Sequence, residues 1–431
     1  MHDTNQQLRG GQLALWLAAE LVPINFALTA RIRGAFTAEQ LRQALEKLQI
    51  KHPRLAMRTE KQSDGNVYLV PDAGLTIPVR RLERKHADSW IEEAAAELVQ
   101  NFDMRRAPPL RLVWLEGSEF SDIIFVCPHT LADGLSTAYL TRDLLMFLSD
   151  PGRALEPLPL EPSLEALIPA FSGKRLVIWQ AKLLSLIYKV LLRLRSKNAR
   201  AITNPAAIDA EYRLLNWELT HEQTAALAAR SRAENTTVHA ALCAAFLRAF
   251  GELHGDGWRR VIKSPINLRN RLAAPVGESF GIFIGLTEFP VDCAPEHDLW
   301  ELARKIKKCL VKQTRDKSIF APLLAMCQFM DSMATVVTPS LLIQLVTRVK
   351  CDLSITNLGA LAFPVQYGSL QLVALYGPSV SGKRNEINLG VNTVNKKMHL
   401  TLSFTEQKLT LAQAERIKNI AMRRLAEASN F

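Results

Sequence analysis

Several features are scarce or absent in this sequence, and each absence removes a class of protein. Aromatic residues make up 7% of the 431 residues, which argues against a surface for stacking nucleic-acid bases. The six cysteines form no Cys-x-x-Cys pair, so zinc ribbons and disulfide frameworks are not supported and buried free thiols are expected. No run of 18 uncharged apolar residues occurs, which argues against a transmembrane span. The polar start, residues 1–7, does not resemble a signal peptide, so we expect a cytoplasmic protein.

The overall composition is that of a globular protein with an excess of basic residues. Hydrophobic residues make up 48% and charged residues 22%, and the length suits two to three domains with their own cores. The net charge of +11 suits nucleic acid, an anionic membrane surface, or an acidic or phosphorylated partner. Composition alone leaves these alternatives open.

Periodicity predicts two halves of mixed helix and strand. In residues 1–170, alternation over 25–33 predicts a strand, and Thr37 is placed to cap the helix that follows. Residues 110–115 and 123–127 predict a hairpin that runs directly into a polar motif. Residues 171–207 are a predicted linker, and residues 208–431 again contain a mixture of predicted helices and strands. We therefore predict an α/β protein of two similar halves.

The predicted linker contains a strongly basic segment. Residues 174–200 hold eight Lys or Arg and no acidic residue. On a helix, Arg175, Lys182, Lys189 and Arg193 fall within a stripe about 40° wide, and most other positions are apolar. The segment is either a packed helix with snorkelling cations or a helix that binds a membrane surface or a partner. We expect a binding role, weakened by reversing Lys182 and Lys189.

Pro128-His129-Thr130-Leu131-Ala132-Asp133-Gly134 is the strongest candidate for chemistry. An imidazole titrates near neutral pH, so His129 at the end of a strand can take a proton from a hydroxyl or amine nucleophile. Asp133 either fixes the local turn or only caps the helix that begins at Gly134. These residues alone do not decide between a catalytic motif and a helix cap.

Other motifs are incomplete. Residues 377–384 approach a phosphate-binding loop, but Arg384 stands where Ser or Thr would hold magnesium, so we expect a hairpin loop. His221-Glu222 lacks the second histidine of a zinc protease, and no metal site is predicted. His52 is expected to cap a helix C-terminus, and His239 to be a core histidine.

Motifs in a consistent order along nearly the whole chain resemble one family. They are an apolar strand leading into His-x-x-x-Asp-Gly-x-Ser, then Ser264-Pro265-Ile266-Asn267-Leu268-Arg269 and Thr356-Asn357-Leu358-Gly359. This order resembles the CoA-dependent acyltransferase superfamily, which includes chloramphenicol acetyltransferase, condensation domains and polyketide-associated acyltransferases. The resemblance implies two chloramphenicol-acetyltransferase-like halves forming a pseudodimer with a channel between them.

The resemblance also implies roles for individual residues. His129 would be the general base, while Asp133 and Gly134 would be structural and Arg269 would pair with Asp133. Thr356 and Asn357 would contribute to an oxyanion or substrate site. One position departs from the family pattern, because Pro128 stands where many members carry a first histidine.

The expected reaction is transfer of an acyl group from a thioester to a hydroxyl acceptor. The donor would be acyl-CoA or the phosphopantetheine thioester of an acidic acyl carrier protein, with no permanently bound cofactor. We expect a monomer with a small-molecule acceptor, no nucleic-acid partner, and peripheral membrane contact through 174–200. The alternatives are a standalone condensation-type enzyme that forms an amide, and a catalytically silent paralogue that binds carrier proteins.

Overall fold

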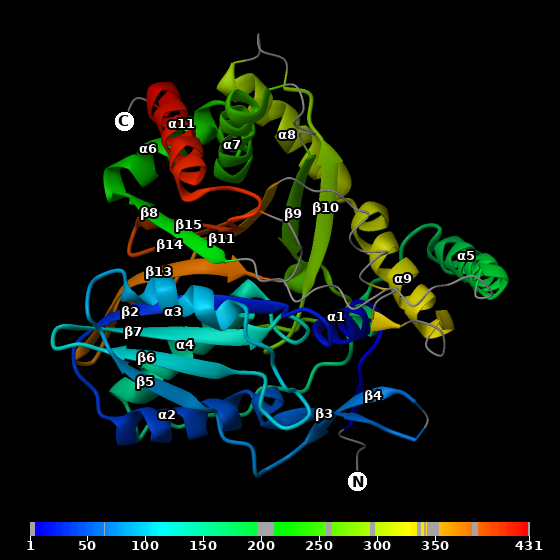
Figure 1. Cartoon of the computed structure of the whole chain (residues 1–431), viewed down its shortest axis with the longest axis horizontal. Coiled ribbons are helices and arrows are strands. Elements are labelled where there is room, and N and C mark those ends of the chain that lie inside the picture. The colour runs from blue at the N-terminus through cyan, green and yellow to red at the C-terminus, as the bar shows by residue number, and fades with distance from the viewer. Residues whose placement is uncertain are drawn as a thin grey trace.

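Two six-stranded sheets form the body of the molecule, as the computed structural model shows (Figure 1). The structure describes residues 5–63, 65–195, 211–255, 261–293, 298–333, 338–339, 342, 353–381 and 387–429, and side chains within 188–195 are not part of that description. A small third sheet contains β1 (Gln6–Gln7), β4 (Val67–Pro71) and β3 (Met57–Lys61). The molecule is therefore an α/β protein, as the sequence predicts.

The first sheet is mostly antiparallel and is built largely from the first half of the chain. Its order is β12 (Gln366–Tyr367), β13 (Leu370–Val380), β2 (Asn25–Arg33), β7 (Phe120–Pro128), β6 (Arg111–Glu116) and β5 (Val79–Glu83). The predicted hairpin is present as β6 and β7, which pair in antiparallel register. The sequence also predicts a short strand over 75–83, and the strand present there, β5, is shorter and begins at Val79.

Helices cover both faces of this sheet. Helix α2 (Ala38–Lys51) begins at Thr37, whose side chain forms a capping box with Gln40, and it ends at His52, the predicted C-cap. It packs beside α4 (Gly134–Ser149) over one core, while α3 (Ser89–Leu98) inserts Trp90, Ala94 and Leu98 into a core on the opposite face. The sheet is thus fixed on both sides, which gives the strand that leads into His129 a rigid support.

The second sheet carries the other large core. Its order is β10 (Ile284–Pro290), β9 (Val261–Asn267), β11 (Leu353–Ala360), β14 (Ile387–Val394), β15 (Lys397–Thr405) and β8 (Tyr212–Leu219). Four helices gather over it in Figure 1: α6 (His221–Ala233), α7 (Val238–His254), α8 (Leu299–Gln313) and α11 (Leu411–Ser429). The sequence also offers Thr236 as the start of the helix that follows, but α7 is capped by Thr237, whose side chain accepts a hydrogen bond from Ala240 N.

Strand β13 connects the two sheets. It belongs in sequence to residues 208–431, yet it pairs with β2 of the first sheet over Phe26–Arg33. At Gly390 of β14, an added Cβ would lie 1.9 Å from the Pro378 carbonyl oxygen, so the two strands cross at a position that only glycine permits. Residues 1–170 therefore do not complete their own sheet.

Three further helices lie at one edge of the molecule. They are α1 (Gly10–Ala19), α5 (Lys174–Arg195) and α9 (Asp316–Met333), and α9 contacts both of the others. Helix α5 confirms a helix within 174–200, whereas residues 196–200 lie outside the described part. No helix in the described ranges is both long enough and apolar enough to cross a bilayer.

Candidate active site

His129 follows β7 directly, at the point where the chain turns toward α4. Its backbone N–H donates to Ile24 O over 2.8 Å, and its side-chain Nδ1 lies 2.8 Å from Ala132 O. A carbonyl oxygen can only accept, so Nδ1 carries the proton and the basic lone pair resides on Nε2. The half-buried ring also contacts Phe26, with ring centroids 5.7 Å apart. The loop therefore fixes both the orientation and the tautomer of the imidazole.

Asp133 is buried and forms an ion pair across the two halves. Its carboxylate caps α4 by accepting from Ser136 N, and it meets Arg269 through Nη1–Oδ2 and Nη2–Oδ1 distances of 2.8 and 3.2 Å. Burial by itself would favour the neutral acid. The Arg269 charge and hydrogen bonds nevertheless lower the pKa of Asp133 below its ordinary value. The expected ion pair between Asp133 and Arg269 is therefore present, and Asp133 also caps helix α4.

Backbone groups of residues 279–283 complete this junction. Phe283 N donates to Asp133 Oδ2 over 2.8 Å, and Asp133 N donates to Gly281 O over 3.1 Å. The Ser136 hydroxyl accepts from Arg269 and donates to Gly281 O. No motif in the sequence predicts this segment, because backbone amides and carbonyls leave no signature in residue type.

Gly134 and the Thr356-Asn357-Leu358 segment lie next to each other. A Cβ on Gly134 would come within 2.6 Å of Leu358 Cδ2, so the glycine allows β11 to approach the start of α4. Asn357 Oδ1 accepts from Gly359 N over 2.8 Å, and Thr356 is half-buried in β11. The structure thus brings the Thr356 region to the motif from the other half of the chain.

The six predicted residues therefore form one region, with His129 at its edge. Asp133 supports His129 through the loop that joins the two residues, because it fixes the start of α4. Pro128, the last residue of β7, is buried opposite Asn25 of β2. The position beside His129 that many family members fill with an imidazole is thus occupied by a packed apolar ring.

A second buried charge cluster lies along α4. Asp143 accepts from His52 Nε2 and pairs with Lys51 Nζ, both at 2.8 Å, and Arg142 bonds both Asp143 and Glu278. Burial would raise the pKa of Asp143, but hydrogen bonds from His52 and Lys51 and the Arg142 charge lower it to about 2. This cluster fastens the end of α2 to α4 and, through Glu278, to the second half.

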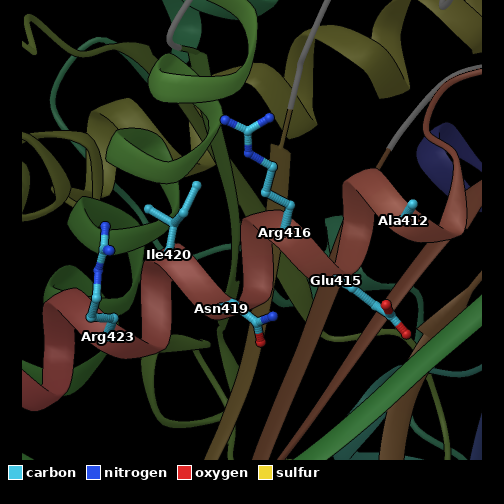
Figure 2. Close-up of a pocket in the computed structure, with 6 residues that line it drawn as sticks. All are labelled: Ala412, Glu415, Arg416, Asn419, Ile420 and Arg423. Carbon is cyan, nitrogen blue, oxygen red and sulfur yellow. The ribbon is translucent and has the colours of Figure 1, made fainter.

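The remaining candidates do not form a second site. His239 is half-buried rather than part of the core, and its Nε2 lies 2.8 Å from Ser264 Oγ. Desolvation lowers the pKa of its imidazole to about 4, so the side chain is neutral at pH 7. Gly377–Val380 lies in β13 rather than in the predicted hairpin loop, while Lys383 and Arg384 fall outside the described residues. A surface depression on α11, drawn in Figure 2, is lined by Ala412, Glu415, Arg416, Asn419, Ile420 and Arg423. That depression contains no residue of the motif.

The described part of the chain contains neither a cluster of metal ligands nor a disulfide bond. No three His, Cys, Asp or Glu side chains gather there as metal ligands, and no disulfide joins the described cysteines. Cys351 lies outside the described ranges.

Comparisons with known proteins identify relatives of both halves. Residues 19–162 match the family model of the condensation domain, and residues 211–399 match the phthiocerol/phthiodiolone dimycocerosyl transferase C-terminus. The phthiocerol/phthiodiolone dimycocerosyl transferase of Mycobacterium tuberculosis is 25% identical over 288 residues, which cover 65% of this chain and 67% of that protein.

Solved structures share the fold over nearly the whole chain. Polyketide synthase associated protein 5 from Mycobacterium tuberculosis has a TM-score of 0.64 and 17% identity, covering 98% of this chain and 99% of its own. A trichothecene 15-O-acetyltransferase from Fusarium sporotrichioides has a TM-score of 0.71 and 12% identity, covering 98% and 95%.

The two family models and the fold point to the same kind of protein. The architecture is the pseudodimer of two chloramphenicol-acetyltransferase-like halves found in condensation-type proteins. The chain matches two family models of the CoA-dependent acyltransferase superfamily, and its relatives are acyltransferases and condensation domains.

Proposed function

We propose that the protein transfers an acyl group from a thioester to a hydroxyl group of a small-molecule acceptor and releases an ester. The observation that carries this proposal is the hydrogen bond from His129 Nδ1 to Ala132 O, because it leaves the basic lone pair on Nε2. An imidazole in this tautomer, held at the end of a rigid strand, suits the removal of a proton from an alcohol.

The reaction needs a base and a stabilised oxyanion. His129 Nε2 takes the proton of the acceptor hydroxyl while the oxygen attacks the thioester carbonyl carbon. The carbonyl electron pair moves to oxygen and returns as the C–S bond breaks. The imidazolium then gives its proton to the leaving thiolate, so the products are an ester and a thiol. The protein ends each cycle in its starting protonation state.

The neighbouring residues have supporting roles in this proposal. Asp133 and Arg269 hold the loop that carries His129, and Gly134 lets β11 approach it. Thr356 and Asn357 are the candidates for contacting the oxyanion or the substrate, since Leu358 beside them packs at the motif. Asn357 already accepts from Gly359 N through its carbonyl oxygen, so its amide N–H groups would be the donors.

The donor is an acyl-CoA or an acyl group on the phosphopantetheine arm of a carrier protein. The net charge of +11 favours encounter with the phosphates of CoA and with an acidic carrier protein. A thioester is already activated, so the proposed step requires no permanently bound cofactor.

An amide-forming condensation is the second candidate. The match of residues 19–162 to the condensation domain supports it, and the same base would serve an amine. A third candidate is a silent paralogue that only binds carrier proteins. Pro128 supports this candidate, because it replaces the first motif histidine.

A product screen separates these three candidates. The purified chain is incubated with a series of acyl-CoA and carrier-protein thioesters and with matched acceptors that differ only in carrying a hydroxyl or an amine. We expect mass spectrometry to detect an ester together with released thiol. Amide as the sole product would transfer the assignment to condensation. Binding of carrier protein without turnover of any thioester would identify a silent paralogue.

A further inference from the structure

Helix α5 presents an extended apolar face to solvent. It lies at the edge of the molecule beside α9, the described element against which it packs most extensively (Figure 1). Its exposed large residues are Leu176, Trp179, Leu183, Leu184, Leu186 and Ile187, with Trp179 60% and Leu184 65% exposed. Contiguous apolar surface of this kind is unusual on a monomeric protein and marks an interaction site.

The buried residues of the helix are small, and most of its large residues are exposed. Ala181 and Ser185, four residues apart, are buried on the side that meets α9. Leu176, Trp179, Leu183 and Ile187 follow one another at three- and four-residue steps, which places them on the opposite side. Packing against the body of the molecule therefore accounts for the half-buried Val177 and Ile178 but not for the exposed large residues of this helix.

Positive charge borders this apolar face. Arg175 and Lys182 are exposed and seven residues apart, so they lie one above the other on the flank of the face. Across the whole of α5, the sequence contains six Lys or Arg and no acidic residue. An apolar face with a cationic flank is the pattern of helices that lie in a membrane interface.

We propose that the α5 face is a docking surface for an anionic lipid bilayer, on which the protein binds peripherally. Leu176, Trp179, Leu183 and Ile187 enter the headgroup region while Arg175 and Lys182 meet lipid phosphates. A second copy of this chain is a poorer occupant, because pairing two such faces brings like charges together. An acidic protein would satisfy the cations but would not require so many exposed leucines.

Vesicle binding tests the proposal independently of acyl transfer. We expect the protein to co-sediment with vesicles of phosphatidylcholine and phosphatidylglycerol far better than with phosphatidylcholine alone. Each cation near such a surface contributes roughly a factor of five, so the loss of two cations alone weakens binding about thirtyfold. Arg175→Glu with Lys182→Glu also adds two negative charges, so this variant should weaken binding by more than about thirtyfold. High salt should reduce the difference between the two vesicle types.

The matched control is Lys308→Glu with Lys312→Glu, which makes the same change of charge at exposed positions of α8. Equal loss of binding in both double variants would overturn the proposal in favour of general electrostatic attraction. Absence of binding to anionic vesicles by the unaltered protein would also overturn it. Binding of α5 to an acidic carrier protein instead of vesicles would assign the face to that partner.

Trp179 provides a second readout of the same face. Vesicles with brominated acyl chains should quench its fluorescence on binding, and Trp179→Phe should remove that quenching while the protein still co-sediments. Quenching that persists undiminished in Trp179→Phe would show that another tryptophan enters the bilayer, which contradicts docking through α5. Unchanged circular dichroism in each variant confirms that the helix remains folded.

Discussion

Asp133 joins segments that are far apart in the chain. Its carboxylate contacts Ser136 of its own helix, the Arg269 side chain and the Phe283 amide. The exposed fractions of the Arg269 and Asp133 side chains are 4% and 2%, so neither charge can be satisfied by water when its partner is removed. This pair is therefore a positioning device for the loop that carries His129.

Replacing both partners should cost less stability than the two single replacements cost together. We expect Asp133→Asn to lower the free energy of unfolding by about 3–5 kcal/mol, because it leaves the Arg269 charge buried and uncompensated. Arg269→Met should cost a similar amount. The double variant should be more stable than the sum of the two losses predicts, as measured by urea unfolding. Strictly additive losses would show that the two charges do not stabilise each other.

The sequence predicted the ion pair of this junction but neither the Ser136 hydroxyl nor its backbone members. His129 and Asp133 stand out because they belong to a motif, and the family resemblance implies Arg269 as the partner of Asp133. The Phe283 amide and the Gly281 carbonyl contribute just as directly, yet any residue type supplies such groups. Their positions depend on how the two halves pack, which the sequence pattern does not encode locally.

The end of helix α2 and the middle of α4 are joined by Asp143. Lys51 and His52 approach it from α2 and its C-cap, while Arg142 connects it to Glu278. The Asp143 side chain is fully buried, so this cluster acts inside the fold rather than at its surface.

Stability should depend on the ionisation of Asp143. Its folded pKa of about 2 is lower than the ordinary value of 3.8, so its contribution is present above about pH 4 and is lost as the pH falls toward 2. The shift corresponds to about 2 kcal/mol. Urea unfolding at pH 6, 4 and 3 should therefore show a steeper loss for the unaltered protein than for Asp143→Asn. Identical pH slopes would mean that Asp143 is not selectively stabilised as the carboxylate.

Helices with explicit caps were predictable, and those without were not. Thr37 and Thr220 each form a capping box, and both helix starts follow from the sequence. Helix α1 begins after Arg9 with two glycines and no side-chain cap, and α9 contains Pro322, a residue that normally interrupts a helix. Both were absent from the prediction because tertiary packing, rather than local signals, holds them.

At the scale of the whole molecule, β13 couples the two halves. It supplies the neighbour of β2 in the first sheet, and the Asn392 side chain of the second sheet donates to Leu375 O and Gly377 O of β13. Alternating strand residues predict that a strand exists but not which sheet it joins. The place of β13 in the first sheet is therefore known only from the assembled structure.

Because a strand of the second half completes the first sheet, we expect that the halves do not fold separately. A fragment of residues 1–195 lacks β12 and β13, which leaves the backbone groups of β2 unpaired along one edge. We expect this fragment to aggregate or to be degraded rapidly by protease, whereas the full chain unfolds in one main calorimetric transition. A fragment that unfolds cooperatively on its own would show that the first half is an independent domain.

The proposed role of His129 as general base of an acyl transfer is tested by the rate of ester formation by His129→Ala. The control is His221→Ala, which removes an exposed histidine at the start of α6. We expect His129→Ala to lower kcat about 10²- to 10⁴-fold with an unchanged Tm, while His221→Ala keeps full activity. Full turnover by a folded His129→Ala variant would show that His129 is not the general base.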